Sequence, residues 1–114
     1  MDKFIVNGVT FTDFGTNNYS NGMHLITAAS FPATMVQDVL AGKYPGIHLN
    51  PSAPCGEEFF GVFGTPEQYS EFYNRQKNAR LSSQILNKMG YNWDDSRYQE
   101  IKAEVEANYK DWWE

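Results

Sequence analysis

The chain has 114 residues, of which 41% are apolar, 20% are charged and 16% are aromatic, and its formal net charge is −5 at pH 7. This length suits one domain with its own hydrophobic core, without disulfide staples. Net negative charge disfavours non-specific binding to nucleic acid or to an anionic membrane, because both require a basic surface. The composition therefore predicts one soluble domain, residues 1–114, with no direct contact to nucleic acid or membrane.

The N-terminus and the cysteine content indicate the compartment. Met1 is followed by Asp2 and an alternating pattern, rather than by the basic and apolar regions of a signal peptide. Cys55 is the lone cysteine, so an intramolecular disulfide is excluded. No segment approaches the roughly eighteen apolar residues that a membrane-spanning helix needs. These features predict a cytoplasmic protein.

The first part of the chain, residues 1–64, is predicted to be rich in strands. Residues 3–12 place β-branched and aromatic side chains on both sides of Asn7-Gly8, the dipeptide best suited to a two-residue turn with positive φ, and predict a β-hairpin. The polar residues 15–22 predict a loop, because Asn, Ser and Gly favour turns. Alternation in residues 23–27 predicts a third strand.

A short helix and a second loop are expected next. Residues 32–41 predict the helix, because its apolar side chains fall on one face. These side chains are Met35, Val36, Val39 and Leu40. The proline- and glycine-rich residues 43–56 predict a loop, with residues 47–49 extended inside it. Residues 58–63 predict a further strand, in which Gly61 marks a bulge or a close backbone contact.

Residues 66–114 predict a helical hairpin. Thr65 to Gln68 reads as a capping box with proline at the first helical position, so a helix is expected from Pro66 to Met89. Asp94 is the predicted cap of a second helix that continues to residue 114, with Trp93 stapled to Tyr98. The predicted fold class is therefore α+β. It combines a small antiparallel sheet, built from the N-terminal hairpin and one or two further strands, with a short helix and a C-terminal antiparallel helical hairpin.

Charge and apolar patterning predict how the two helices pair. Residues 72–90 hold four basic and no acidic side chains, whereas residues 94–114 hold seven acidic and three basic ones. Antiparallel packing would let these charges neutralise one another. The apolar stripe of the second helix consists of Tyr98, Ile101, Val105, Tyr109 and Trp112. Its expected partners are Tyr69, Phe72, Gln76, Ala79 and Leu86, and self-association as a homodimer or presentation to a partner are alternatives.

Few side chains suggest catalysis or metal binding. His24, His48 and Cys55 do not stand at the short spacings of metal ligands. Glu57 and Glu58 follow the cysteine, and their negative charge disfavours a thiolate nucleophile. We therefore predict no metal, no cofactor and no catalytic residues, and an enzyme is the less favoured class.

The favoured function is a non-catalytic protein-binding module. Small size, negative charge and surplus Tyr and Trp fit, for example, a small acidic inhibitor or regulatory protein of the phage or mobile-element type. Such a protein would act on a larger protein with a basic surface, for example one that binds nucleic acid. Trp113 and Tyr73 fall off the main stripes and are the expected exposed anchors. The full set assigned to the partner is Trp113, Tyr73, Glu100, Glu104, Glu106 and Asp111.

The alternative function is a small-ligand or nucleotide-binding, sequestering protein that uses loops 15–22 and 43–56. Both loops are long for a compact domain, and loops of this kind commonly carry binding residues on a rigid scaffold. The side chains assigned to the ligand are Asn17, Asn18, Tyr19, Asn21, His48 and Asn50. An anion at the N-terminus of the helix that begins at Pro66 is disfavoured by Glu67 beside it.

Overall fold

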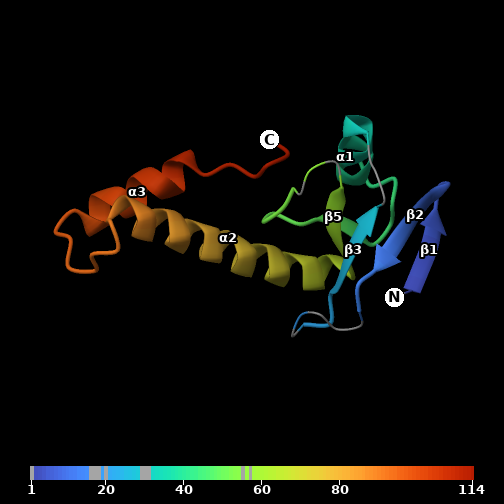
Figure 1. The fold of residues 1–114 in the computed structure, drawn as a ribbon, viewed down its shortest axis with the longest axis horizontal. Helices are drawn as coiled ribbons and strands as arrows, with labels where there is room; N and C mark the ends of the chain where they lie inside the picture. Colours follow the sequence, from blue (N-terminus) through green and yellow to red (C-terminus); the bar gives the residue numbers. More distant parts are fainter. Residues whose placement is uncertain (1, 16–18, 20, 29–31, 55, 57) are drawn as a thin grey trace.

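The computed structural model of the protein describes residues 2–15, 19, 21–28, 32–54, 56 and 58–114. In chain order its elements are β1 (Asp2–Val6), β2 (Val9–Asp13), β3 (His24–Ala28), α1 (Ala33–Leu40), β4 (Ile47–Leu49), β5 (Phe59–Phe63), α2 (Pro66–Lys88) and α3 (Tyr98–Asn108). The described strands form one antiparallel sheet in the order β1-β2-β3-β5-β4. The predicted α+β class is confirmed, with α2 and α3 in contact beyond the sheet (Figure 1).

The N-terminal hairpin forms as the sequence predicts. Asn7 and Gly8 have φ of 50° and 78°, the pair of positive values that a type I′ turn requires. This turn sets the register of β1 and β2, in which Phe4 pairs with Phe11 and Val6 with Val9. One face of the hairpin therefore presents apolar side chains to the core.

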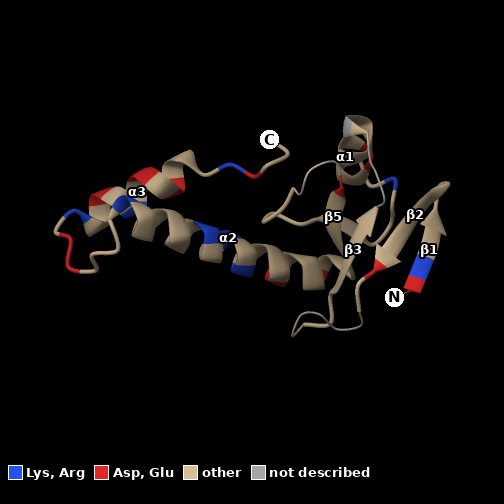
Figure 2. Ribbon diagram, viewed as in Figure 1, with Lys and Arg blue, Asp and Glu red and all other residues tan. Residues whose placement is uncertain are grey.

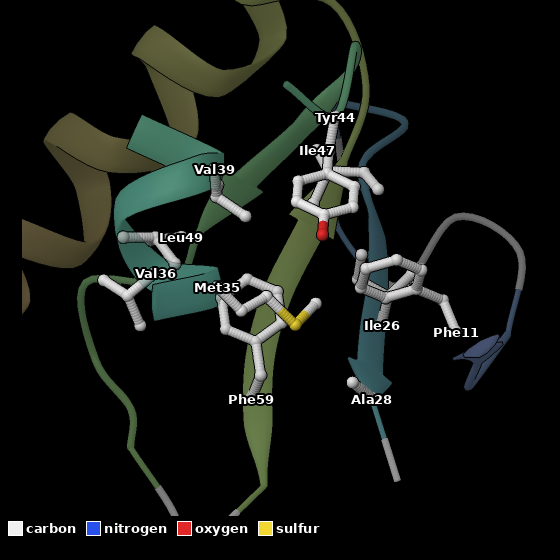
Figure 3. Close-up of a cluster of buried hydrophobic side chains, with 10 residues drawn as sticks. All are labelled: Phe11, Ile26, Ala28, Met35, Val36, Val39, Tyr44, Ile47, Leu49 and Phe59. Carbon is white, nitrogen blue, oxygen red and sulfur yellow. The ribbon is translucent and has the colours of Figure 1, made fainter. Parts of the chain in front are cut away.

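Helix α1 covers that face of the sheet. Met35 and Val39 project from the helix toward Ile26 and Phe59 on the central strands, as Figure 3 shows. The whole buried cluster consists of Phe11, Ile26, Ala28, Met35, Val36, Val39, Tyr44, Ile47, Leu49 and Phe59. Burial of this apolar stripe and of the inward strand positions holds α1 in place.

The first turns of α2 pack on the opposite face. Val62 alternates with Gly61 and Phe63 along β5, so its side chain points away from α1. It is buried with Met23 and with Phe72 of α2. The predicted capping box forms at Thr65, which aims α2 from the end of β5.

Beyond the sheet, α2 and α3 form a helical arm that makes the molecule elongated, with extents of 53 × 29 × 23 Å (Figure 1). Ile85 and Met89 of α2 are buried against Ile101 and Val105 of α3. Phe72, a predicted partner of the α3 stripe, packs on the sheet instead. The antiparallel pairing was therefore predicted correctly for the distal half of α2 only.

The second helix of the arm is shorter than predicted, because it spans residues 98–108 rather than 94–114. Its N-cap is Arg97 and not Asp94. The intervening residues 90–97, here called the tip, form side-chain-stabilised turns instead of a helix. The Oδ1 of Asn92 accepts a hydrogen bond from the Asp94 amide, and the Oδ1 of Asp95 accepts one from the Arg97 amide.

Residues 109–114, here called the tail, leave α3 in extended conformation and return to the sheet. Tyr109 has a ψ of 134°, which ends the helix. Trp112 donates a hydrogen bond from Nε1 to the backbone oxygen of Asn50 at 2.5 Å. Trp112 and Trp113 pack against the main core cluster near α1. Figure 1 shows the C-terminus lying close to α1.

Candidate functional site

A buried carboxylate joins the tail to α2. Asp111 is 5% exposed. Its Oδ2 accepts a hydrogen bond from the Tyr73 hydroxyl at 2.6 Å, and its Oδ1 accepts one from the Tyr109 hydroxyl at 2.8 Å. Lys77 lies 5.6 Å from the centroid of the Tyr109 ring. These contacts hold the tail against the helix.

The tyrosines of this cluster are strongly held in the protonated form. Burial, followed by the hydrogen bond to Asp111, raises the pKa of Tyr109 to about 12. The same two causes raise the pKa of Tyr73 well above its ordinary value. Burial also raises the pKa of Tyr69, whose ring lies 5.9 Å from that of Tyr73. Neutral hydroxyls at physiological pH suit a structural cluster and not a reactive phenolate.

The geometry corrects the expected exposure of three residues assigned to a partner. Tyr73 is half-buried and bonded to Asp111, and Trp113 is half-buried against the core, so neither is a displayed anchor. Asp111 points inward. The reason is the return of the tail, which a continuous helix to residue 114 would have prevented.

The other three assigned acids lie at the surface of α3. Glu100, Glu104 and Glu106 are all exposed. Glu104 accepts a 2.6 Å hydrogen bond from Lys88 Nζ of α2, and this bond lowers the pKa of Glu104. Figure 2 shows acidic positions along α3 and in the tip, beside basic positions of α2. The outer side of α3 therefore keeps an acidic surface.

Two aromatic side chains stand out at the tip. Tyr91 is 69% exposed and Trp93 is 68% exposed, so Trp93 does not form the predicted staple with Tyr98. Neither was predicted from the sequence to be exposed. The sequence signal that could have found them is Gly90, which follows the C-cap of α2 and begins the turn at the far end of the helical hairpin, where side chains have the fewest neighbours.

Hydrogen bonds hold the tip in shape. Tyr91 adopts a φ of 63°, its amide donates to the Leu86 carbonyl, and its hydroxyl donates to Asn87 Oδ1 at 2.8 Å. The guanidinium of Arg97 donates to both carboxylate oxygens of Asp95, at 3.1 and 2.9 Å. The aromatic side chains are thus presented on an ordered turn.

The loop side chains assigned to a small ligand mostly face the protein. Tyr19 packs edge-on to Phe72 with centroids 4.5 Å apart, and burial raises its pKa. Asn21 donates to the Gln68 carbonyl at 2.7 Å. His48 stacks on Tyr69 at 4.3 Å, and burial lowers its pKa.

Asn50, also assigned to that ligand, is buried, and its Oδ1 accepts a hydrogen bond from the Ser52 amide. Asn17 and Asn18, the other two residues assigned to the ligand, lie outside the described residues. The described members of the set therefore hold the two loops against α2 or stabilise a turn within one loop. They do not gather around a shared space.

The two loops nevertheless border a cavity of about 430 Å³ through different residues. Its lining consists of Gly22, His24, Gly46, Phe63, Gly64, Thr65, Pro66 and Gln68. His24 Nδ1 lies 2.9 Å from Asp13 Oδ2. Gly22 belongs to loop 15–22 and Gly46 to loop 43–56, so each loop contributes a glycine to the lining.

The arrangement of the histidines bears on metal and catalytic sites. His24 pairs with Phe63 and His48 with Val62, adjacent residues of β5, so the two imidazoles lie on opposite faces of the sheet. Cys55 and Glu57 lie outside the described residues. Within the described part of the chain, no three His, Cys, Asp or Glu side chains gather closely enough to hold a metal ion.

Comparisons with protein-family models, curated proteins and solved structures found no match to this chain. Across the residues that the structure describes, no helix combines the length and apolar character required to cross a bilayer. Function must therefore be argued from the surfaces and the cavity themselves.

Proposed function

We propose that this protein is a non-catalytic protein-binding module, with the tip of its helical arm as the binding surface. The observation that carries the proposal is the exposure of Tyr91 and Trp93, at 69% and 68%, on one ordered turn. Tyr and Trp are the residue types that most often dominate the binding energy of interfaces. A displayed Trp and Tyr pair on a projecting arm fits insertion into a pocket of another protein.

The order of the tip favours binding, because little conformational freedom remains to be lost. The Tyr91 hydroxyl and the Asp95 carboxylate are already engaged within the tip and α2. A pre-organised surface avoids part of the entropic penalty of association. The held Tyr91 side chain and the ordered backbone of the tip therefore lose less freedom on binding than a flexible loop would.

Charge indicates the kind of partner. Asp94 at the tip and Glu100 and Glu106 on α3 are exposed acids, and the chain carries a net charge of −5. A complementary surface would have an apolar pocket with basic residues around it, which speeds encounter and fixes orientation. This protein would then act as an inhibitor or regulator by occupying that surface on a larger protein.

The test compares capture of partners by the full chain, by a Tyr91→Ala/Trp93→Ala variant and by an Ile5→Ala control. Ile5 is 71% exposed on β1, which lies at the edge of the sheet farthest from β4, so the control removes an equally exposed apolar side chain outside the arm. We expect a stoichiometric partner from source-cell extract to be lost with the tip variant and kept with the control.

The captured partner, once purified, provides the quantitative test. Loss of the Trp and Tyr anchor pair should weaken its affinity by at least about 30-fold, which corresponds to about 2 kcal/mol, the contribution of a single hot-spot residue. Equal binding by the tip variant and the wild type would contradict the proposal. So would the absence of any stoichiometric partner when all three proteins have the same melting temperature.

A further inference from the structure

The cavity between the two loops has features of a binding site that are independent of the arm. Its volume of about 430 Å³ falls within the range of roughly 300–1,000 Å³ typical of small-molecule sites. His24 and Phe63 form a cross-strand pair between β3 and β5, so their rings stand side by side on one face of the sheet. Both rings line the cavity.

Phe63 supplies a rigid apolar surface. Phe63 is 42% exposed, which is unusual for an apolar residue of an inner strand. Gly46, with a φ of 81°, lies so close to this ring that a Cβ would stand 3.0 Å from Phe63 Cε2. Phe4 touches the ring from β1, at a centroid distance of 5.8 Å. The ring is therefore held by its neighbours and still open to a ligand.

His24 supplies the polar group. The Asp13 carboxylate can only accept, so Nδ1 carries the proton in their 2.9 Å hydrogen bond. Nε2 is then the ring nitrogen that has no hydrogen-bond partner among the described residues. In the neutral imidazole this atom accepts a hydrogen bond, so it would recognise an N–H or O–H group of a ligand.

The charges around the cavity disfavour an anion. Asp13 lies behind His24, and Glu67 stands in the first turn of α2. The amides of Thr65 and Gln68 are used by the capping box, at 2.9 and 3.2 Å. The helix N-terminus thus has few free amide donors for a phosphate, and a neutral ligand fits the cavity better.

We propose that this cavity binds a neutral, planar heteroaromatic molecule of nucleoside size. The heteroaromatic ring packs against Phe63, and an N–H group of the ligand donates to His24 Nε2. Gly22, Gly46 and Gly64 also line the cavity beside the two rings. This site does not depend on the tip, so the two proposals can fail separately.

The experiment titrates the ¹⁵N-labelled full chain with adenosine, guanosine, cytidine and uridine and follows amide shifts. We expect at least one nucleoside to saturate with a Kd below about 1 mM, with the largest shifts at Gly22, Gly46, Gly64 and Thr65. Phe63→Leu should weaken that binding about tenfold, because loss of an aromatic stacking surface has an effect of this order. Phe14→Leu is the matched control, since Phe14 is 38% exposed, stacks on Phe60 and does not line the cavity.

Three results would overturn the proposal. The first is the absence of amide shifts with all four nucleosides up to about 10 mM, a concentration tenfold above the largest Kd expected. The second is an unchanged affinity in Phe63→Leu when its spectrum shows a native fold. The third is tighter binding of adenosine monophosphate than of adenosine, which would identify an anion site and contradict a neutral ligand.

Discussion

Replacement of Asp111 by alanine should destabilise the whole protein, because this carboxylate connects the tail to α2. The variant removes the acceptor of the 2.6 Å bond from Tyr73 and of the 2.8 Å bond from Tyr109. Each partly buried hydroxyl that loses its acceptor costs about 1–3 kcal/mol. The wild type also bears the desolvation penalty of a buried carboxylate, which the variant avoids. We therefore expect a net loss of about 3 kcal/mol in the free energy of unfolding.

Urea denaturation of the full chain, followed by far-ultraviolet circular dichroism, measures this loss. A double-mutant cycle with Tyr73→Phe isolates the bond itself, and its coupling energy should be about 1 kcal/mol or more. Asp94→Ala is the matched control, since Asp94 is an exposed acid of the tip, and it should stay within about 0.5 kcal/mol of wild type.

Two outcomes would refute this reasoning about the tail. One is an Asp111→Ala variant as stable as the Asp94→Ala control. The other is full additivity of Asp111→Ala and Tyr73→Phe, which would mean that the hydroxyl and the carboxylate do not interact in solution.

Two further predictions concern the sheet and the tyrosines. Gly61→Ala should cost more than about 2 kcal/mol, because its Cβ would stand 2.6 Å from the His48 carbonyl oxygen; urea midpoints compared with an exposed Ser83→Ala control test this, and equal midpoints would contradict it. Alkaline pH should destabilise the fold, since the folded pKa of Tyr109 is about 12 against an ordinary 10.0. The stability that the protonated Tyr109 hydroxyl contributes is complete below pH 10. It is lost as pH rises from 10 toward 12, because this hydroxyl ionises at lower pH in the unfolded chain than in the folded protein. Tyr109→Phe should lose less stability than wild type over that interval, and parallel loss in the two proteins would disprove the link.

Elements specified by neighbouring residues were predicted well. Asn7-Gly8 defines its own turn through positive φ, and Thr65 to Gln68 forms its cap within four residues. The stripe of α1 was visible because Met35, Val36 and Val39 recur at helical spacing and are all buried, whereas Leu40, predicted with them, is exposed. The prediction of a close backbone contact at Gly61 is also confirmed by the approach of His48. In each case the interactions join residues close in sequence, or a single residue such as Gly61 indicates them.

The candidate sites were predicted less well, because they depend on contacts between distant segments. The hydrophobic pattern of residues 94–114 is compatible with one helix, and nothing local shows that the chain extends after Asn108. The tail is held by bonds across 38 residues, from Tyr73 to Asp111, and across 62 residues, from Trp112 to Asn50. Its return leaves Tyr73 and Trp113, which the sequence predicted to be exposed anchors, half-buried, and leaves Tyr91 and Trp93 as the displayed pair.

The sequence by itself determined the strands, the starts of α1 and α2, and the contact between α3 and the distal half of α2, since propensity, capping and periodicity act over a few residues. Only the tertiary structure decided which aromatic side chains face solvent and which glycines border a cavity. Exposure depends on what packs from elsewhere in the chain, and β5 brings together β3 and β4, which are far apart in sequence. Contacts between segments distant in sequence likewise place His24 beside Phe63 and bring the Asp111 carboxylate within hydrogen-bond distance of Tyr73.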